Sequence, residues 1–119
     1  MATIATTTVA GPYLNEDTSP QLTTVTFTEA EAAGNTVSIS KPTLLLFWNT
    51  EATTARTVTV TSTHDPFGRL GNITAFSIPA GSIVSRIFHP TGWETTVGGG
   101  TMSFTVSGAS VDVAAIPLS

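Results

Sequence analysis

The side chains that could do chemistry are few and scattered along the chain. His64 and Asp65 stand next to each other and resemble an acid–base pair. Such a pair needs a nucleophile or a water molecule within hydrogen-bond reach, and neighbouring residues seldom point at one another. An Asp before Pro66, followed by Gly68, is the usual composition of a turn. We therefore expect a turn at this place and no catalytic pair.

Patterns for metal, phosphate or thiol chemistry are also missing. The chain has no cysteine and only two histidines, and its eight carboxylates are dispersed, which excludes Cys-based zinc sites and gives no calcium loop. The run from Gly98 to Thr101 lacks the lysine of a phosphate loop. No serine is flanked by the glycines of a nucleophile elbow. We expect no enzyme, no cofactor and no metal site.

Length and charge narrow the class of protein further. The 119 residues have the size of one domain. Four Lys and Arg against eight Asp and Glu give a net charge of -4, which excludes a basic nucleic-acid surface. The longest apolar run, Leu44–Trp48, is far below the roughly 20 residues that span a membrane. Met1–Ile4 has neither region of a signal peptide, so we expect cytosolic synthesis.

The elements that must position these residues are strands. Apolar residues alternate with Thr or Ser, as around Val25 and Phe27 or Val58 and Val60, and this period of two indicates antiparallel strands with one wet face. Threonine, with 24 copies, fills most polar positions and suits a pleated surface. The pattern predicts an all-β fold, a single antiparallel β-sandwich or barrel. The expected strands number seven to eight, at residues 24–28, 35–40, 43–48, 56–62, 73–78, 83–89, 101–107 and 110–115. The helical candidate, 28–33, allows one turn.

The apolar run is the exception to this alternation. As a strand, it places Leu45 and Phe47 on one face and Leu44, Leu46 and Trp48 on the other. One of these sets must be covered by a second layer or by another protomer. We therefore expect a homotrimer built partly on this run, with Leu45 and Phe47 as interface candidates.

Residues 1–20 differ from the sandwich domain expected at residues 21–119. They carry no period, so they form either a frayed terminus or an extended N-terminal arm that orders against a neighbouring chain. In the second case Tyr13 and Leu14 are its anchors, and the arm contributes little to the fold. Phe67 and Trp93 lie in turns, where each aromatic either folds back on the core or anchors an interface.

Residues 43–116 combine these segments in a recognisable order. An apolar strand closes in Asn49 and a Thr/Val strand follows, then Ile78-Pro79-Ala80-Gly81, an aromatic turn at 88–93 and two closing strands at 100–107 and 111–116. This order resembles the small all-β head decoration (cement) proteins of tailed bacteriophages. The resemblance implies a β-sandwich or barrel, a frequently trimeric state, an N-terminal arm that contacts capsid subunits, and no active site.

We therefore expect a non-enzymatic virion structural protein that binds the outer face of the major capsid protein lattice and stabilises it. It would lie on the capsid surface after synthesis in the host cytoplasm. Two alternatives stay open: another virion component (tail, neck or fibre), and a carbohydrate-binding or adhesive module that stacks sugars on Trp48, Trp93 and Tyr13. Coplanar, exposed aromatics would favour the sugar module, and aromatics buried at a self-interface would favour the virion protein.

Overall fold

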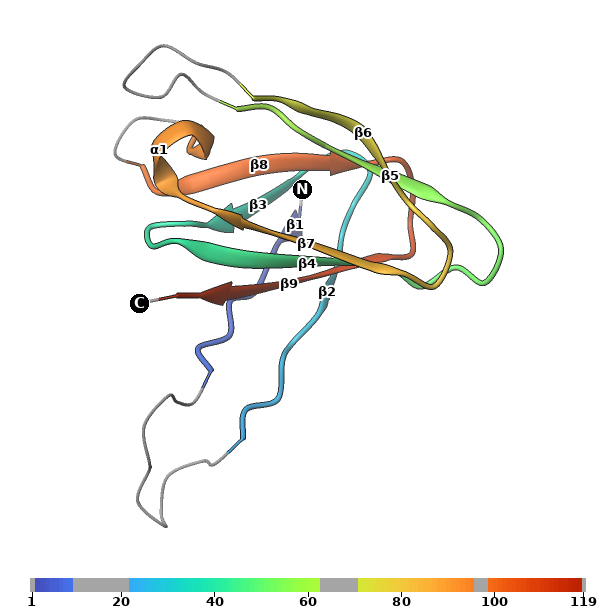
Figure 1. Cartoon of the computed structure of the whole chain (residues 1–119), viewed down its shortest axis with the longest axis horizontal. Coiled ribbons are helices and arrows are strands. Elements are labelled where there is room, and N and C mark those ends of the chain that lie inside the picture. The colour runs from blue at the N-terminus through green and yellow to red at the C-terminus, as the bar shows by residue number, and fades with distance from the viewer. Residues whose placement is uncertain (1, 10–21, 63–70, 96–98, 119) are drawn as a thin grey trace.

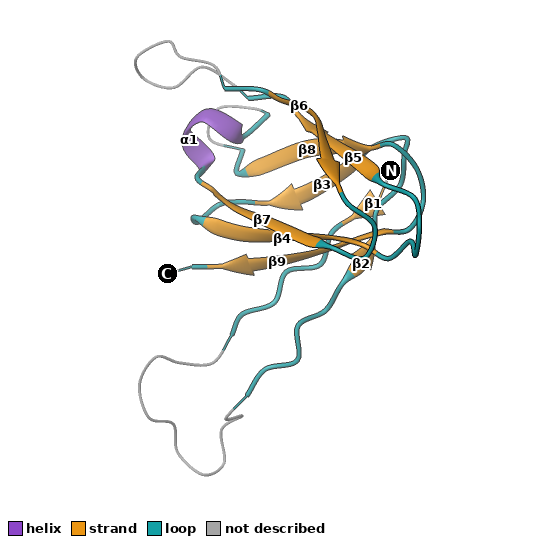
Figure 2. Ribbon diagram, turned by 45° about the vertical axis from the view of Figure 1, so that its right-hand side comes forward, coloured by secondary structure: helices purple, strands orange, loops and turns teal. Residues whose placement is uncertain are grey.

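Two β-sheets face each other in the computed structural model of the chain, which describes residues 2–9, 22–62, 71–95 and 99–118 (Figures 1 and 2). Within these residues there are nine strands and one short helix, α1 (Pro90–Trp93). The strands are β1 (Ala2–Thr3), β2 (Thr28–Glu29), β3 (Asn35–Ser38), β4 (Thr43–Asn49), β5 (Arg56–Val60), β6 (Ile73–Ile78), β7 (Ile83–Phe88), β8 (Thr101–Val106) and β9 (Val111–Pro117).

The strands form one five-stranded and one four-stranded sheet. Sheet A has the order β1-β3-β8-β5-β6, and sheet B has the order β2-β9-β4-β7. All strand pairs are antiparallel except β1 with β3. The prediction of an antiparallel β-sandwich is therefore confirmed.

The core lies between the two sheets. Because side chains alternate along a strand, each sheet turns one set inward. The Phe47 ring of β4 meets the Phe104 ring of β8 edge-on, with 5.3 Å between centroids. Burial of each large apolar side chain contributes about 1.5–3 kcal/mol to folding. The buried inward residues of β3, β4, β5, β7, β8 and β9 include Val37, Leu45, Phe47, Val58, Val60, Phe88, Met102, Phe104, Val111 and Val113.

The helical candidate at residues 28–33 forms no helical turn. Thr28 and Glu29 pair with β9 as a short strand, and a turn follows them. The Asn35 side chain holds that turn, because its Oδ1 accepts the Glu31 N–H at 2.8 Å and its Nδ2 donates to the Glu31 carbonyl at 2.8 Å. Gly34 follows with φ 143°, a backbone angle that favours glycine.

Residues 2–9 join the two sheets along one side of the sandwich. β1 pairs with β3 of sheet A, and the Ile4 N–H donates to the Thr36 carbonyl at 2.8 Å. Three residues later the Thr7 N–H donates to the Ala115 carbonyl of sheet B at 2.7 Å. The Ile4 side chain is only 2% exposed and belongs to the core. This part of the expected arm is therefore part of the fold, while residues 10–20 lie outside the described residues.

The central strand β4 ends at a buried polar residue. The Asn49 Nδ2 donates to the Thr54 and Ile78 carbonyls, each at 2.9 Å. Its Oδ1 accepts the Glu51 N–H at 3.0 Å. Asn49 is fully buried, and these bonds satisfy its amide group where no water reaches.

Candidate functional site

The outer face of sheet A is a hydroxyl surface. On β3, β8 and β5 the residues between the inward-facing aliphatic ones are all Thr or Ser, and the strand registers bring them side by side. The result is a sheet face that is polar through hydroxyl groups and carries no charge of its own. We call this set the hydroxyl face: Thr36, Ser38, Thr57, Thr59, Ser77, Thr101, Ser103 and Thr105.

The outer face of sheet B is largely apolar instead, with Asp112 of β9 as a charged residue opposite Trp48. We call its large apolar residues Leu44, Leu46, Trp48, Ile83 and Ile87 the aliphatic face. The register places Leu44 beside Ile87 and Trp48 beside Ile83. Ile83 is 53% and Ile87 is 55% exposed. Exposed apolar patches of this kind are a common feature of interaction sites.

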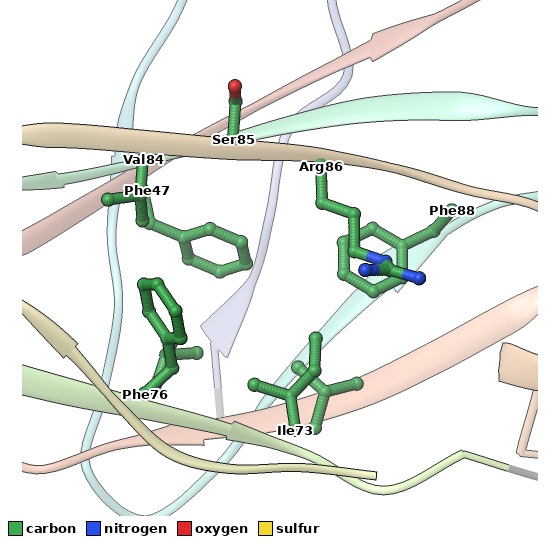
Figure 3. A pocket seen from close by; sticks show the side chains of 9 residues that line it. Phe47, Ile73, Phe76, Val84, Ser85, Arg86 and Phe88 are labelled. Carbon is green, nitrogen blue, oxygen red and sulfur yellow. The ribbon is translucent and has the colours of Figure 1, made fainter. Parts of the chain in front are cut away.

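A groove opens between the edge strands β6 and β7, and we call it the β6–β7 groove (Figure 3). Its volume is about 190 Å³, and its walls come from β4, β5, β6 and β7. Phe47 lies at its floor and Phe76 at its mouth, where the Phe76 ring stays 54% exposed. Arg86 reaches into the same opening from β7. The groove is thus an apolar opening in the sandwich with the guanidinium group of Arg86 beside it.

The structure corrects two of the predicted interface residues. Leu45 and Phe47 point between the sheets and are buried in the core, where sheet A covers them. They are therefore not available to a partner. The opposite side of the same strand, with Leu44, Leu46 and Trp48, belongs to the aliphatic face. Sheet A thus covers Leu45 and Phe47, and the side chains that a partner could contact are those of the aliphatic face.

Trp93 folds back on the core from α1. Its ring packs edge-on against Phe88, with centroids 4.8 Å apart and an interplanar angle of 85°. The Arg86 guanidinium lies 5.5 Å from the centre of the same ring, which is the geometry of a cation–π contact. Three other predicted anchors, Tyr13, Leu14 and Phe67, lie outside the described residues, as does the pair of residues 64–65.

The described aromatic residues do not form a platform for sugars. Trp48 packs edge-on against Phe27, with 5.6 Å between centroids and an interplanar angle of 71°. Trp93 packs in the same manner against Phe88. Each indole therefore packs against another ring, and neither contact has the coplanar arrangement that would favour the carbohydrate alternative.

One ion pair sits where β4, β5 and β9 meet. The Arg56 guanidinium lies 3.3 Å from the Glu51 carboxylate. A hydrogen bond from Ser110, followed by the bond from Arg56, lowers the pKa of Glu51. Both bonds favour the charged carboxylate, so the site fixes the chain between two strands and offers no proton near neutral pH.

His89 serves as a helix cap. Its Nδ1 accepts the Thr91 N–H at 3.0 Å at the start of α1. Across the described ranges, no group of three or more His, Cys, Asp or Glu side chains could hold a metal ion. The described residues contain no helix that is long and apolar enough to cross a membrane.

Comparison with protein-family models, with curated proteins and with solved structures finds no match to this chain. The surfaces themselves must therefore indicate the function. Sequence reasoning missed the contribution of Ile83 and Ile87 to the aliphatic face. A signal existed, because Ile83 and Ile87 are four residues apart and so share one face of a strand.

Proposed function

We propose that the protein is a non-enzymatic virion structural protein that decorates a bacteriophage capsid and stabilises it. It binds the outer face of the major capsid protein lattice and acts on the virion surface. The order of segments over residues 43–116 is the source of the capsid assignment. The surfaces of the sandwich support a binding role.

The observation that carries the proposal is the contrast between the two outer faces. One sheet presents hydroxyl groups, and the other presents five large apolar side chains, with Ile83 and Ile87 more than half exposed. The apolar side chains of this face lose little on leaving water, because they carry no charge, although the face also holds the carboxylate of Asp112, opposite Trp48 on β9. A molecule of this kind docks by its aliphatic face and leaves its hydroxyl face in water.

Repetition makes a small contact sufficient. A stable contact covers about 800 Å² on each partner, which is modest for a single small domain. Copies that associate with one another and bind neighbouring capsid subunits raise the overall affinity, because the second contact forms at high effective concentration. We propose a homotrimer as the unit that binds, in keeping with the state that the resemblance implies.

Co-sedimentation with undecorated heads tests the proposal. Ile87→Asp places a charge on the aliphatic face at a half-exposed position, and Thr105→Asp places the same charge on the hydroxyl face. We expect Ile87→Asp to weaken attachment at least tenfold, about 1.4 kcal/mol, and Thr105→Asp to bind like the wild type. Thermal melting confirms beforehand that both variants fold.

Two results would overturn this proposal. Equal attachment of both variants would remove the aliphatic face from the contact. Binding of the wild type to tails or fibres, with no binding to heads, would replace the capsid by another part of the virion.

A further inference from the structure

The strand β7 is an open edge of sheet B. The Asn49 N–H donates to the Ser82 carbonyl and the Asn49 carbonyl accepts the Gly81 N–H, each at 3.0 Å, so the backbone groups of Asn49 face β7 at the start of the β4–β7 ladder. Hydrogen-bonded pairs alternate along antiparallel strands. The backbone groups of residues 84, 86 and 88 therefore face β4, and those of Ile83, Ser85 and Ile87 face outward. These three residues offer N–H and C=O groups to a further strand.

Sheet B also has one strand fewer than sheet A. At the β6–β7 groove, no strand of sheet B among the described residues lies opposite β6, and Phe76 points inward from this edge of sheet A but stays 54% exposed. Figure 3 shows the Phe76 ring beside Phe47, with Val84 and Arg86 above the opening. A strand added to β7 would lie across this opening and cover the Phe76 ring.

Arg86 decides which strand can enter. The Arg86 side chain points toward the groove from the inner face of the edge strand β7. Among the described residues it contacts the Trp93 ring, and no carboxylate of these residues lies within ion-pair distance of it. An inward-pointing charge at a sheet edge discourages unspecific strand pairing, because an added strand would bury the charge unpaired. A strand with a carboxylate opposite Arg86 avoids that cost and gains a charge-assisted hydrogen bond.

We propose that the β7 edge binds an extended segment of a partner protein that carries an acidic side chain opposite Arg86 and apolar side chains opposite Val84 and Phe88. The outward backbone groups of β7 supply affinity, and the carboxylate supplies selectivity. This inference names the chemistry of a partner segment, and it rests on β7 and the groove alone. It would hold whether or not the assembly is a capsid.

A pair of synthetic peptides tests the proposal. The probe has the sequence Thr-Val-Thr-Glu-Thr-Val-Thr, which reads the same in both directions and aligns its acid with Arg86 and its valines with the two apolar positions. The control peptide has Gln in place of Glu. Amide shifts of the ¹⁵N-labelled full chain report where and how tightly each peptide binds. We expect the acidic peptide to shift the amides of Ile83, Ser85 and Ile87 and to bind at least tenfold more tightly than the control.

Three variants locate the contact. Arg86→Gln should abolish the preference for the acidic peptide without loss of the fold. Ser85→Pro removes an outward N–H that β4 does not use, so it should block binding to an intact sandwich. Ser77→Pro is the matched control, because the Ser77 N–H faces outward from β6, as the bond from the Ser107 N–H to Thr57 implies. It should leave binding unchanged.

The outcomes separate clearly. Absence of amide shifts on β7 at about 1 mM peptide, an affinity of only about 4 kcal/mol, would overturn the proposal. Equal binding of both peptides, or a preference that persists in Arg86→Gln, would overturn the role of the carboxylate. Attachment of the protein to heads is measured separately, so failure here leaves the proposed function standing.

Discussion

The buried Ile4 side chain makes residues 2–9 part of the core, and its truncation tests this assignment. Ile4→Ala removes three carbon atoms at a site that is 2% exposed. At about 0.8 kcal/mol for each buried carbon, the transfer cost alone is about 2.4 kcal/mol. The cavity left in the core raises the total toward the upper part of the range of about 2–5 kcal/mol for such truncations. For a domain of this size, each kcal/mol lowers Tm by roughly 4 °C.

Urea unfolding followed by tryptophan fluorescence measures the loss. Val9→Ala is the matched control, because Val9 ends the same segment but is exposed, and it should stay within about 0.5 kcal/mol of the wild type. If Ile4→Ala is equally neutral, the segment detaches before the sandwich unfolds, and the assignment of Ile4 to the cooperative core is wrong.

Three further predictions follow from single positions. Leu45→Asp leaves a buried unpaired charge and should unfold the domain, whereas Leu46→Asp, on the outer face, should keep the circular dichroism spectrum of a folded sandwich. A folded Leu45→Asp variant would contradict the assigned faces of β4. Asn49→Ala should lower the free energy of unfolding, measured in urea, by about 2–4 kcal/mol, because it leaves the buried Thr54 and Ile78 carbonyls without hydrogen-bond donors. A loss below about 0.5 kcal/mol would show that these carbonyls are not buried. The hydrogen bond from Ser110 lowers the pKa of Glu51, so the charged carboxylate stabilises the folded state. The wild type should therefore be more stable than Glu51→Gln above about pH 4.5, and this difference should disappear as the pH falls through the lowered pKa. A difference in urea midpoint that does not change with pH would contradict this prediction.

The sequence predicted the central strands because their alternation is local. Strands such as β8 need only the order of Met102, Phe104 and Val106 among hydroxyl residues to define an inward face. The helical candidate at residues 28–33 is not a helix for a reason that is also local, since the Asn35 amide stabilises a turn that competes with a helix. Residues 2–9 could not be placed, because their partners β3 and β9 are far away in sequence.

The candidate site was harder to predict for the same physical reason. The two faces of Leu44–Trp48 follow from the period of two, but which face is inward depends on how the sheets stack. Arg86 stands out in the sequence as one of only four cations, but its position at an open edge is a property of strand order, which the sequence does not show. Tyr13 and Phe67 lie outside the described residues, so their role stays a prediction.

The buried Asn49 has a consequence for how the chain finds its register. A strand that is apolar on both faces is poorly specified by hydrophobicity, because a slip of one residue exchanges one apolar set for the other. Such a slip in β4 would bring Trp48 or Thr50 to the Asn49 site, and because each of these side chains has a single donor, it would leave at least one of the Thr54 and Ile78 carbonyls unsatisfied. Asn49 thus distinguishes the correct alignment from its nearest competitors. Replacement by an apolar residue of similar size would remove this distinction and let misaligned, aggregation-prone forms compete during folding.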